Sequence, residues 1–327
     1  MQDAPNSIET SLAGLKPGEW KERLIAQADE NGMHQQLGKQ HFATFIDQKS
    51  TLMVTFETMQ GIRALSETAQ PFGFELVRTL GWSHLCVVSD GDTWFRNELI
   101  YGFFDQLIDD GFFEEFDKVV FYGAGPCGYA AAAYSVAAPG ATVVVVQPQA
   151  TLDPRISEWD DRFPEIRRTS FSDRYGYAPD MLDAAENAFV IYDPREELDA
   201  MHATLFERPN VCRLRMPNMG GALQTRMVEM HILFRILTLA GIGKLSKEAF
   251  YTLYRARRDN APYLYALRAR LEADERPYLL AMLYRNVTSR MNAPKFSRLL
   301  EALEKRGAAG EVRLPPAPTR EESPKRA

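Results

Sequence analysis

The sequence predicts an α/β fold with a mostly parallel sheet and helices on both faces. The strongest indication is residues 118–150, KVVFYGAGPCGYAAAAYSVAAPGATVVVVQPQA, where two apolar runs flank a glycine turn and an alanine-rich stretch. Short apolar runs between turn signals are typical of buried strands, and a run of small residues is typical of a helix packed closely on them. Such a unit joins two parallel strands through a right-handed crossover.

Two more apolar runs extend the predicted sheet. LMVTFET (52–58) and HLCVVS (84–89) have the composition of strands, and an amphipathic helix is predicted near 97–109. Residues 246–306 are strongly helical, with prolines that divide them into about three helices. The C-terminal residues are rich in proline and charge and poor in aromatics, which is typical of disorder.

These patterns predict four parts of the chain. The expected order is a helical lead-in, an α/β core that contains a cap region, a helical appendage and a disordered tail. Their expected bounds are 1–48, 49–240 with the cap near 150–187, 241–306 and 307–327.

Composition limits the classes of function. The 327 residues are 45% apolar and 25% charged, as in ordinary globular proteins. Cys86, Cys127 and Cys212 are far apart and lack C-x-x-C spacing, so neither a metal site nor a disulfide framework is expected. No signal peptide and no apolar run of about 18 residues is apparent, which predicts a cytoplasmic protein without a membrane span.

Charge is unevenly distributed. Residues 251–306 hold 12 Lys+Arg and 6 Asp+Glu, and residues 307–327 hold 4 and 3, so these segments carry +6 and +1. Because the whole chain carries −6, residues 1–250 carry −13. This asymmetry indicates either ordinary charged helix surfaces, or a homo-oligomer or an acidic partner. No RNA-binding motif accompanies the arginines, so no nucleic acid is expected.

The glycine turn has two interpretations. In the first, Gly123, Gly125 and Gly128 form the G-x-G-x-x-G of flavin and nicotinamide enzymes, whose turn GAGPCG resembles, and FAD or NAD would be the cofactor. Two features disfavour it. The unit begins near residue 118, whereas such folds commonly open with it, and the second strand ends in Gln147 where an acidic residue would bind the ribose.

In the second interpretation the turn is a nucleophile elbow, G-x-S-x-G, with Gly125 at the serine position. QPQATLDPRISEWDDRF (147–163) resembles a stretch of bacterial α/β-hydrolase-like proteins that often accompany glycan biosynthesis. AFVIYDPREELDAMHA (188–203) and VCRLRMPNMGGALQ (211–224) resemble their segments that carry the acid and the histidine. The resemblance covers roughly residues 50–235 and implies an α/β-hydrolase-like fold.

The same resemblance implies a degenerate triad. The nucleophile and histidine positions hold Gly125 and Gly221, and Asp193 or Asp199 stands at the acid position. Acyl transfer needs a nucleophile and a proton acceptor, so an active serine hydrolase is not expected. The favoured function is a binding module without a cofactor, for a small molecule or a protein partner, linked to glycan metabolism.

A third function is disfavoured by its motifs. Chains of this kind are sometimes labelled phosphoadenosine phosphosulfate reductases, but neither the SGG-x-DS loop nor the C-G-x-H motif of that family occurs here. The remaining functions are therefore the binding module and the dinucleotide-dependent oxidoreductase.

Several side chains are candidates to line a ligand pocket with the turn glycines. Glu57 ends the first predicted core strand, whose following loop would supply part of an oxyanion hole, and a carboxylate there disfavours acyl chemistry. Trp94 and Arg96 lie in a loop expected beside the turn. The alternatives are a paired Glu57, a Trp94 that caps the core and an Arg96 that pairs with a neighbouring aspartate. Cys127 is either a pocket residue or, as favoured, a buried core thiol.

Two further features have structural alternatives. The cap region mixes aromatic residues and arginines, which suits a sugar or anion site or a packed cap with a charged rim. Asp199 and His202 are three residues apart, which predicts a local pair on one helix face.

Overall fold

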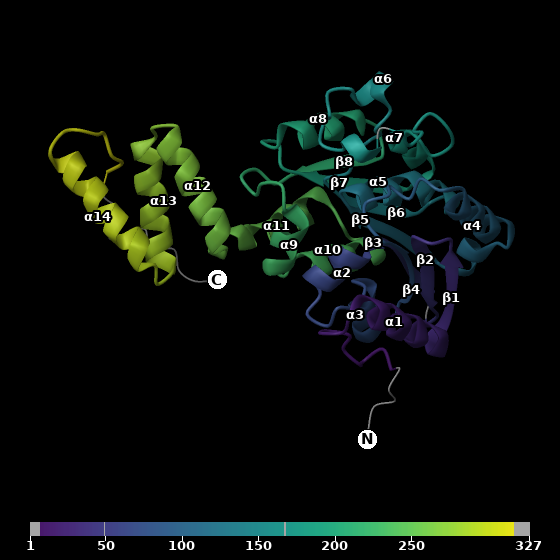
Figure 1. The fold of residues 1–327 in the computed structure, drawn as a ribbon. Coiled ribbons are helices and arrows are strands. Elements are labelled where there is room, and N and C mark those ends of the chain that lie inside the picture. Colours follow the sequence, from purple (N-terminus) through teal and green to yellow (C-terminus); the bar gives the residue numbers. More distant parts are fainter. Residues whose placement is uncertain (1–6, 49, 167, 317–327) are drawn as a thin grey trace. The chain divides into compact units, whose positions relative to one another are not determined.

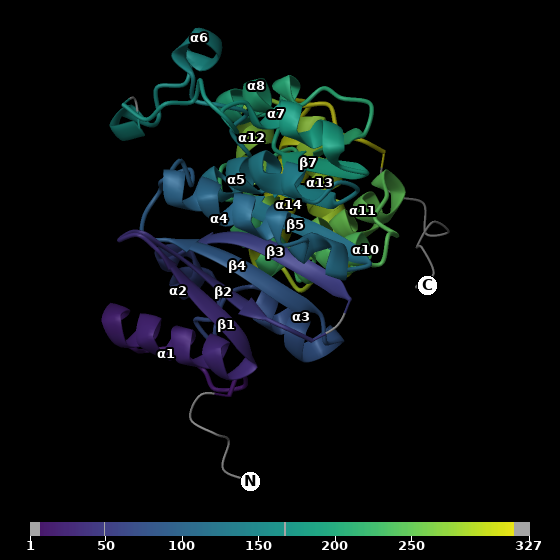
Figure 2. The ribbon, with the colours of Figure 1, turned by 90° about the vertical axis from the view of Figure 1, so that its right-hand side faces the viewer.

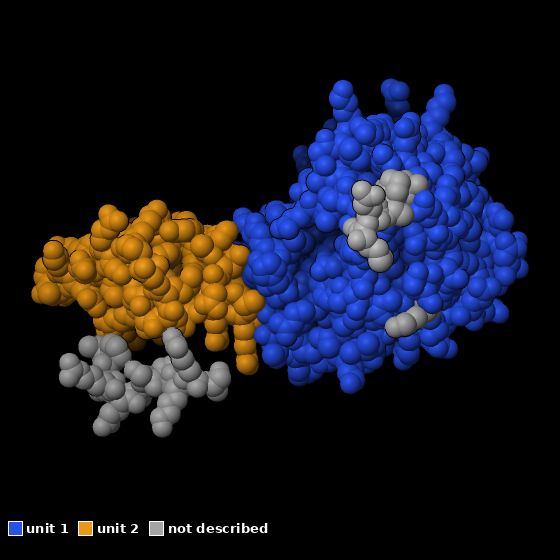
Figure 3. All heavy atoms as spheres, turned by 90° about the horizontal axis from the view of Figure 1, so that it is seen from below, with its two compact units in different colours: residues 1–254 blue, residues 255–327 orange. Residues whose placement is uncertain are grey.

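The computed structural model describes residues 7–48, 50–166 and 168–316, and it divides the chain into two compact units. The first unit comprises residues 1–254 and the second residues 255–327 (Figure 3). Of the tail expected over 307–327, residues 317–327 lie outside the described residues.

One eight-stranded sheet forms the centre of the first unit, in the order β1-β2-β4-β3-β5-β6-β7-β8. Its strands are β1 (Gly32–Leu37), β2 (His41–Ile46), β3 (Thr51–Thr58), β4 (Ser83–Ser89), β5 (Lys118–Ala124), β6 (Thr142–Val146), β7 (Asn187–Tyr192) and β8 (Val211–Arg215). β2 is antiparallel to both of its neighbours, and all other pairs are parallel. The predicted α/β class with a mostly parallel sheet is confirmed.

Helices cover both faces of this sheet (Figures 1 and 2). One face packs against α4 (Glu98–Asp109), α5 (Pro126–Tyr134), α7 (Ala178–Met181) and α8 (Glu197–Leu205). The opposite face packs against α1 (Pro17–Asn31), α2 (Met59–Leu65), α3 (Gly73–Leu80), α10 (Leu233–Gly241) and α11 (Lys247–Tyr254). The short helices α6 (Pro154–Ser157) and α9 (Leu223–Glu229) lie in loops after β6 and β8. Two buried faces explain why the central strands are continuously apolar.

The lead-in expected to be helical over 1–48 differs from the structure. Among residues 7–48, which the structure describes, only α1 is helical, and β1 and β2 form a hairpin that extends the sheet. Every residue of β2, HFATFI, is buried between β1 and β4, whereas β1, GMHQQL, is mostly exposed and polar. Polar edge strands lack the apolar alternation that identifies a strand in a sequence.

The second unit is a small helical unit whose described α-helices are α12 (Ala261–Ala273), α13 (Pro277–Arg290) and α14 (Pro294–Ala308). They share an apolar core that includes Leu264, Tyr284 and Phe296. The appendage expected from residue 241 begins later, at Arg255, since α11 packs against β8 and the Tyr254 hydroxyl lies 3.3 Å from the Pro217 carbonyl oxygen. Among the described helices, none has the length and apolarity to cross a bilayer.

Candidate functional site

The turn between β5 and α5 is a sharp elbow. Its apex is Gly125, whose φ of 57° and ψ of −125° suit glycine far better than residues with a side chain. Gly123 has no room for a side chain, because an added Cβ would lie 2.1 Å from the Cys127 carbonyl oxygen. Gly128 lets α5 approach β6, since its added Cβ would lie 3.3 Å from the Val146 carbonyl oxygen. Close packing of helix on sheet therefore accounts for Gly123 and Gly128.

The apex itself is open. An added Cβ on Gly125 would meet no described atom within 4 Å beyond its chain neighbours, and the residue is partly exposed. A nucleophile elbow presents its side chain at such a point above the sheet. The turn thus has the shape that the chemistry requires, with a bare backbone at its apex.

Pro126 directly follows the apex residue. In a nucleophile elbow, the backbone N–H of the residue after the nucleophile stabilises the oxyanion. Pro126 occupies that position as the first residue of α5, and proline has no N–H. The sequence reasoning above missed this residue, although the proline in GAGPCG was a sufficient signal.

The loop after β8 reaches the same end of the sheet as the elbow. The backbone N–H of Gly125 donates to the carbonyl of Val146 at 2.8 Å, and the N–H of Leu223 donates to Oε1 of Gln147 at 3.0 Å. Val146 and Gln147 are consecutive residues at the end of β6, so both loops are anchored at one point. Gly221, two residues before Leu223, therefore belongs to the neighbourhood of the elbow.

Asp193 holds the backbone of that loop. It follows β7, is 1% exposed and accepts three backbone hydrogen bonds. The donors are the N–H groups of Arg195 at 2.9 Å, Met219 at 2.7 Å and Gly220 at 2.8 Å. The carboxylate at the predicted acid position thus fixes the loop that contains Gly221.

Glu196 lies beside two glycines of the loop after β8. Added Cβ atoms on Gly220 and Gly221 would lie 4.0 and 3.9 Å from the two carboxylate oxygens of Glu196. Burial raises the pKa of Glu196, and the nearby carboxyls of Asp193 and Asp199 raise it further. The sequence reasoning did not identify Glu196, because its relevance depends on where the loop after β8 folds.

Asp199 links α8 to the stretch after β6. It is buried, and its two oxygens accept from Nε2 of Gln147 and from a terminal nitrogen of Arg162, each at 2.6 Å. Of the two predicted acid candidates, Asp193 contacts the loop after β8 and Asp199 contacts the 147–163 stretch.

The predicted local pair between Asp199 and His202 is wrong. Nδ1 of His202 accepts from the backbone N–H of Ala150 at 3.2 Å, so Nε2 carries the proton and donates to Asp160 at 2.8 Å. The side chains of His202 and Asp160 are both fully buried, and the ring of Trp159 packs on the imidazole with centroids 4.5 Å apart. The partner lies 42 residues away along the chain, so local helical spacing could not reveal it.

Trp94 is a buried residue of the loop after β4. Its indole Nε1 donates to Oε1 of Gln149 at 3.2 Å, and its ring meets that of Phe163 edge to face at 4.7 Å. The side chain thus packs against the 147–163 stretch and is completely buried. Its role in lining a ligand pocket stays a prediction.

Arg96 attaches the same loop to residues 170–174, which lie in the predicted cap region. Its guanidinium donates to the carbonyls of Ser170 at 3.0 Å and Arg174 at 2.7 Å, and it pairs with Asp173. The ring of Phe171 lies 5.4 Å from the guanidinium carbon, and the Arg96 side chain is 1% exposed. The aspartate partner belongs to the cap and not to the adjacent loop, where the sequence offered Asp90 and Asp92.

Glu57 lies on the sheet face covered by α2 and α3. Its carboxylate accepts from the Thr55 hydroxyl at 2.7 Å and, with both oxygens at 3.1 Å, from the N–H of Phe72. Burial raises the pKa of Glu57 despite these bonds. A role for Glu57 in a ligand pocket also stays a prediction.

Cys127 is a buried thiol on the first turn of α5. Burial raises its pKa well above the usual range, so the helix N-terminus does not produce a reactive thiolate.

Gln147, at the position where a dinucleotide fold would place its acidic residue, bonds to Asp199 and Leu223. A dinucleotide cofactor remains an expectation for experiment.

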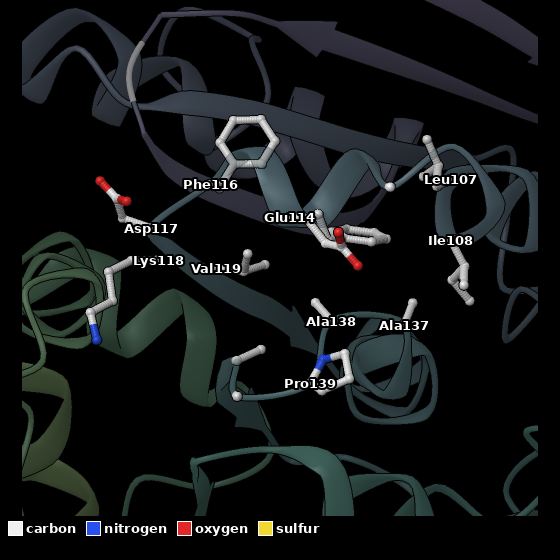
Figure 4. Close-up of a pocket in the computed structure, with 14 residues that line it drawn as sticks. Leu107, Ile108, Glu114, Phe116, Asp117, Lys118, Val119, Ala137, Ala138 and Pro139 are labelled. Atoms are coloured by element: carbon white, nitrogen blue, oxygen red, sulfur yellow. The ribbon is translucent and has the colours of Figure 1, made fainter.

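A cavity of about 370 Å³ lies at the other end of β5 (Figure 4). It is lined by the ends of α4 and β5 and the turn before β6, including Ile108, Glu114, Phe116, Lys118 and Pro139. The seven residues of β5 separate this cavity from the elbow by roughly 20 Å. The cavity therefore does not belong to the elbow.

No protein-family model and no curated protein matches the chain. Solved structures with a similar fold include the Glycosylation Associate Protein (Gap123) complex from Streptococcus agalactiae, at 12% identity over 61% of this chain and 44% of that one, with a TM-score of 0.42. EstE1, a carboxylesterase from a metagenomic library, is 13% identical over 74% of this chain and 98% of its own, with a TM-score of 0.40. An esterase of Pyrobaculum calidifontis is 15% identical over 72% and 94%, with a TM-score of 0.43. The chain spans less than half of the Gap123 chain, and the fold class rests on the strand order and elbow described above.

Proposed function

We propose that this chain is a catalytically inactive α/β-hydrolase-like protein that binds a small molecule or a protein partner at the elbow. The observation that carries the proposal is the bare apex, Gly125, followed directly by Pro126. The apex offers neither an oxygen nor a sulfur nucleophile, and the residue after it offers no N–H to an oxyanion. Gly221 adds no proton acceptor at the histidine position.

The expected loss of activity is large because each missing group acts in the same transition state. Loss of one oxyanion donor typically lowers kcat by about 10²–10³-fold. Loss of the nucleophile or base leaves only the residual rate that binding and the oxyanion hole supply. With all three changes together, ester hydrolysis at the background rate is the expected result.

The same changes leave room for a bound molecule. Gly125 and Gly221 present backbone where a hydrolase has two functional side chains, and their loops meet at Val146 and Gln147. The carboxylate of Glu196 lies beside this room as a hydrogen-bond acceptor. A ligand rich in hydroxyl donors suits such a surface, which supports a glycan intermediate as the ligand class.

The activity part of the proposal is tested with p-nitrophenyl acetate and a fluorophosphonate probe. We expect the wild-type protein to hydrolyse the ester at the rate of buffer and to take up no probe. Hydrolysis above that rate, abolished by Gly125→Trp and retained by Gly243→Trp, would overturn it. Gly243 is a matched control because it also has a positive φ, of 68°, and no described atom within 4 Å of an added Cβ beyond its chain neighbours.

The binding part is tested by native and denaturing mass spectrometry of freshly purified protein. A bound metabolite that is lost in Gly125→Trp and kept in Gly243→Trp would support an elbow site. An extra mass equal to FAD or NAD would instead make Gly123, Gly125 and Gly128 a phosphate cradle and favour the oxidoreductase. A bare chain would exclude a tightly held small molecule and leave a protein partner, with the multiplicity of the native ion reporting self-assembly.

A further inference from the structure

A row of polar side chains lies inside the sheet on the face that α2 and α3 cover. Thr55 and Glu57 alternate along β3, and His84 and Cys86 alternate along β4, so all four point to one face. Thr55 and Cys86 are register partners between the two strands. Apolar residues would normally fill this position, so the row requires an explanation.

The row is nearly inaccessible to water. Glu57 is 9% exposed, His84 is 1% exposed and Cys86 is fully buried. Thr55 connects them, since its hydroxyl donates to Glu57 at 2.7 Å and lies 2.9 Å from Nε2 of His84. The Cys86 sulfur lies 3.6 Å from Oε1 of Glu57. A carboxylate oxygen, an imidazole nitrogen and a sulfur therefore lie within 4.8 Å of one another.

Two buried polar atoms near this row lack hydrogen-bond partners within the described part of the chain. They are Nδ1 of His84 and the hydroxyl of Thr44, which is the register partner of Cys86 on β2. Buried polar atoms are normally paired, and an unpaired one costs about 1–3 kcal/mol. The hydrogen bonds of the protein alone therefore leave this region incompletely satisfied.

We propose that Glu57, His84 and Cys86 bind a zinc ion. Carboxylate, imidazole and thiolate are the donors that zinc prefers. With zinc–ligand distances of about 2.0–2.3 Å, tetrahedral ligand atoms lie roughly 3.3–3.8 Å apart, so atoms already within 4.8 Å need only small movements. A dication with one carboxylate, one thiolate and a neutral imidazole has no net charge, which removes the main objection to ionic groups in an interior.

The surroundings suit a structural site. The Phe72 N–H bonds both oxygens of Glu57 and so fixes the carboxylate from outside. Gly73, the first residue of α3, packs directly on the imidazole, because an added Cβ would lie 2.2 Å from Nε2 of His84. The start of α3 thus closes the site, and the Thr55 hydroxyl or one water completes the fourth position. Such an ion would join β3, β4 and α3, independently of what the elbow binds.

The test begins with full-length protein that is unfolded in chelator and refolded with Zn²⁺ or Co²⁺. We expect one metal per chain after gel filtration, a thiolate-to-cobalt charge-transfer absorption, and a melting temperature several degrees higher with zinc than without. X-ray absorption of the zinc form should show one sulfur at about 2.3 Å and nitrogen or oxygen neighbours at about 2.0–2.1 Å.

Two serine variants make the test specific. Cys86→Ser should lose the cobalt absorption and weaken zinc binding by more than ~100-fold in chelator competition, since it removes a direct ligand. Cys212→Ser, at a partly exposed thiol on β8, should keep both. Folded wild-type protein without bound metal, a metal without a sulfur neighbour, or equal binding by Cys86→Ser would overturn the proposal. If Cys86→Ser fails to fold, the X-ray absorption of the wild-type protein decides.

Discussion

The elbow and the Glu57–His84–Cys86 cluster are opposites in one molecule. The elbow has an open apex and a backbone shaped for a nucleophile, yet it carries no chemical side chain at Gly125. The cluster has three side chains able to ligate or transfer protons, yet it lies buried between the sheet and α3. The comparison shows that side chains able to do chemistry and a backbone geometry suited to catalysis can lie at different places in one molecule. We therefore look for ligand binding at the open elbow and for a structural role in the buried cluster.

The largest expected effect breaks the elbow geometry. Gly123→Ala would place a Cβ 2.1 Å from a backbone carbonyl oxygen that cannot move without α5. We expect a loss of about 3 kcal/mol or more in the free energy of unfolding, measured in urea. Gly125→Ala is the matched variant, because its Cβ enters open space and costs only about 1–2 kcal/mol for the positive φ. Equal losses for the two variants would contradict the close packing of α5 on β5.

A smaller effect concerns the buried carboxylate that holds the 147–163 stretch on α8. Burial alone would raise the pKa of Asp160, but hydrogen bonds from His202 and Arg162 outweigh it and hold that pKa below its usual range. Asp160→Asn should cost about 2 kcal/mol at neutral pH, because bonds to charged groups are worth roughly that amount. Asp161→Asn, at the exposed neighbour, should change stability by less than about 0.5 kcal/mol.

The lowered pKa of Asp160 also predicts how the stability loss in Asp160→Asn depends on pH. Since the folded pKa of Asp160 is lowered, the stability from its ionised form is present above the unfolded pKa of about 3.9 and is lost as the pH falls through the folded value. The difference in free energy of unfolding between the wild type and Asp160→Asn should therefore be constant from about pH 7 to 5 and become smaller below about pH 4. A gap that widens in acid would show that Asp160 is not ionised in the folded protein.

The smallest expected effect comes from restoring a nucleophile at the apex of the elbow. Gly125→Ser restores the nucleophile oxygen at an apex with room for it, but neither the oxyanion N–H nor a base. We expect ester hydrolysis to remain at the buffer rate, measured with p-nitrophenyl acetate. The comparison variant combines Gly125→Ser with Pro126→Ala and Gly221→His. Ester hydrolysis by the Gly125→Ser variant without the other two changes would show an unrecognised base beside the apex.

The strand–turn–helix–strand unit could be predicted because its signals are local. Residues 118–150 contain both strands, the turn and the helix, and the structure places β5, α5 and β6 within them. Gly125 and Gly221 could also be read directly from the sequence. The same holds for Pro126, whose missing N–H is relevant because it directly follows the apex residue. Polar β1 carried too weak an alternation to be recognised, although it pairs along all of β2.

The sequence by itself therefore determined the α/β fold class and the position of the strand–turn–helix–strand unit, because backbone preference and apolar period act over a few residues. Tertiary structure alone decided which charged and polar groups meet. His202 bonds to Asp160 and not to Asp199, Arg96 pairs with Asp173, and Glu57 joins His84 and Cys86 from the next strand. These pairings depend on strand order and loop paths, and residues distant in the chain become neighbours only when the sheet forms.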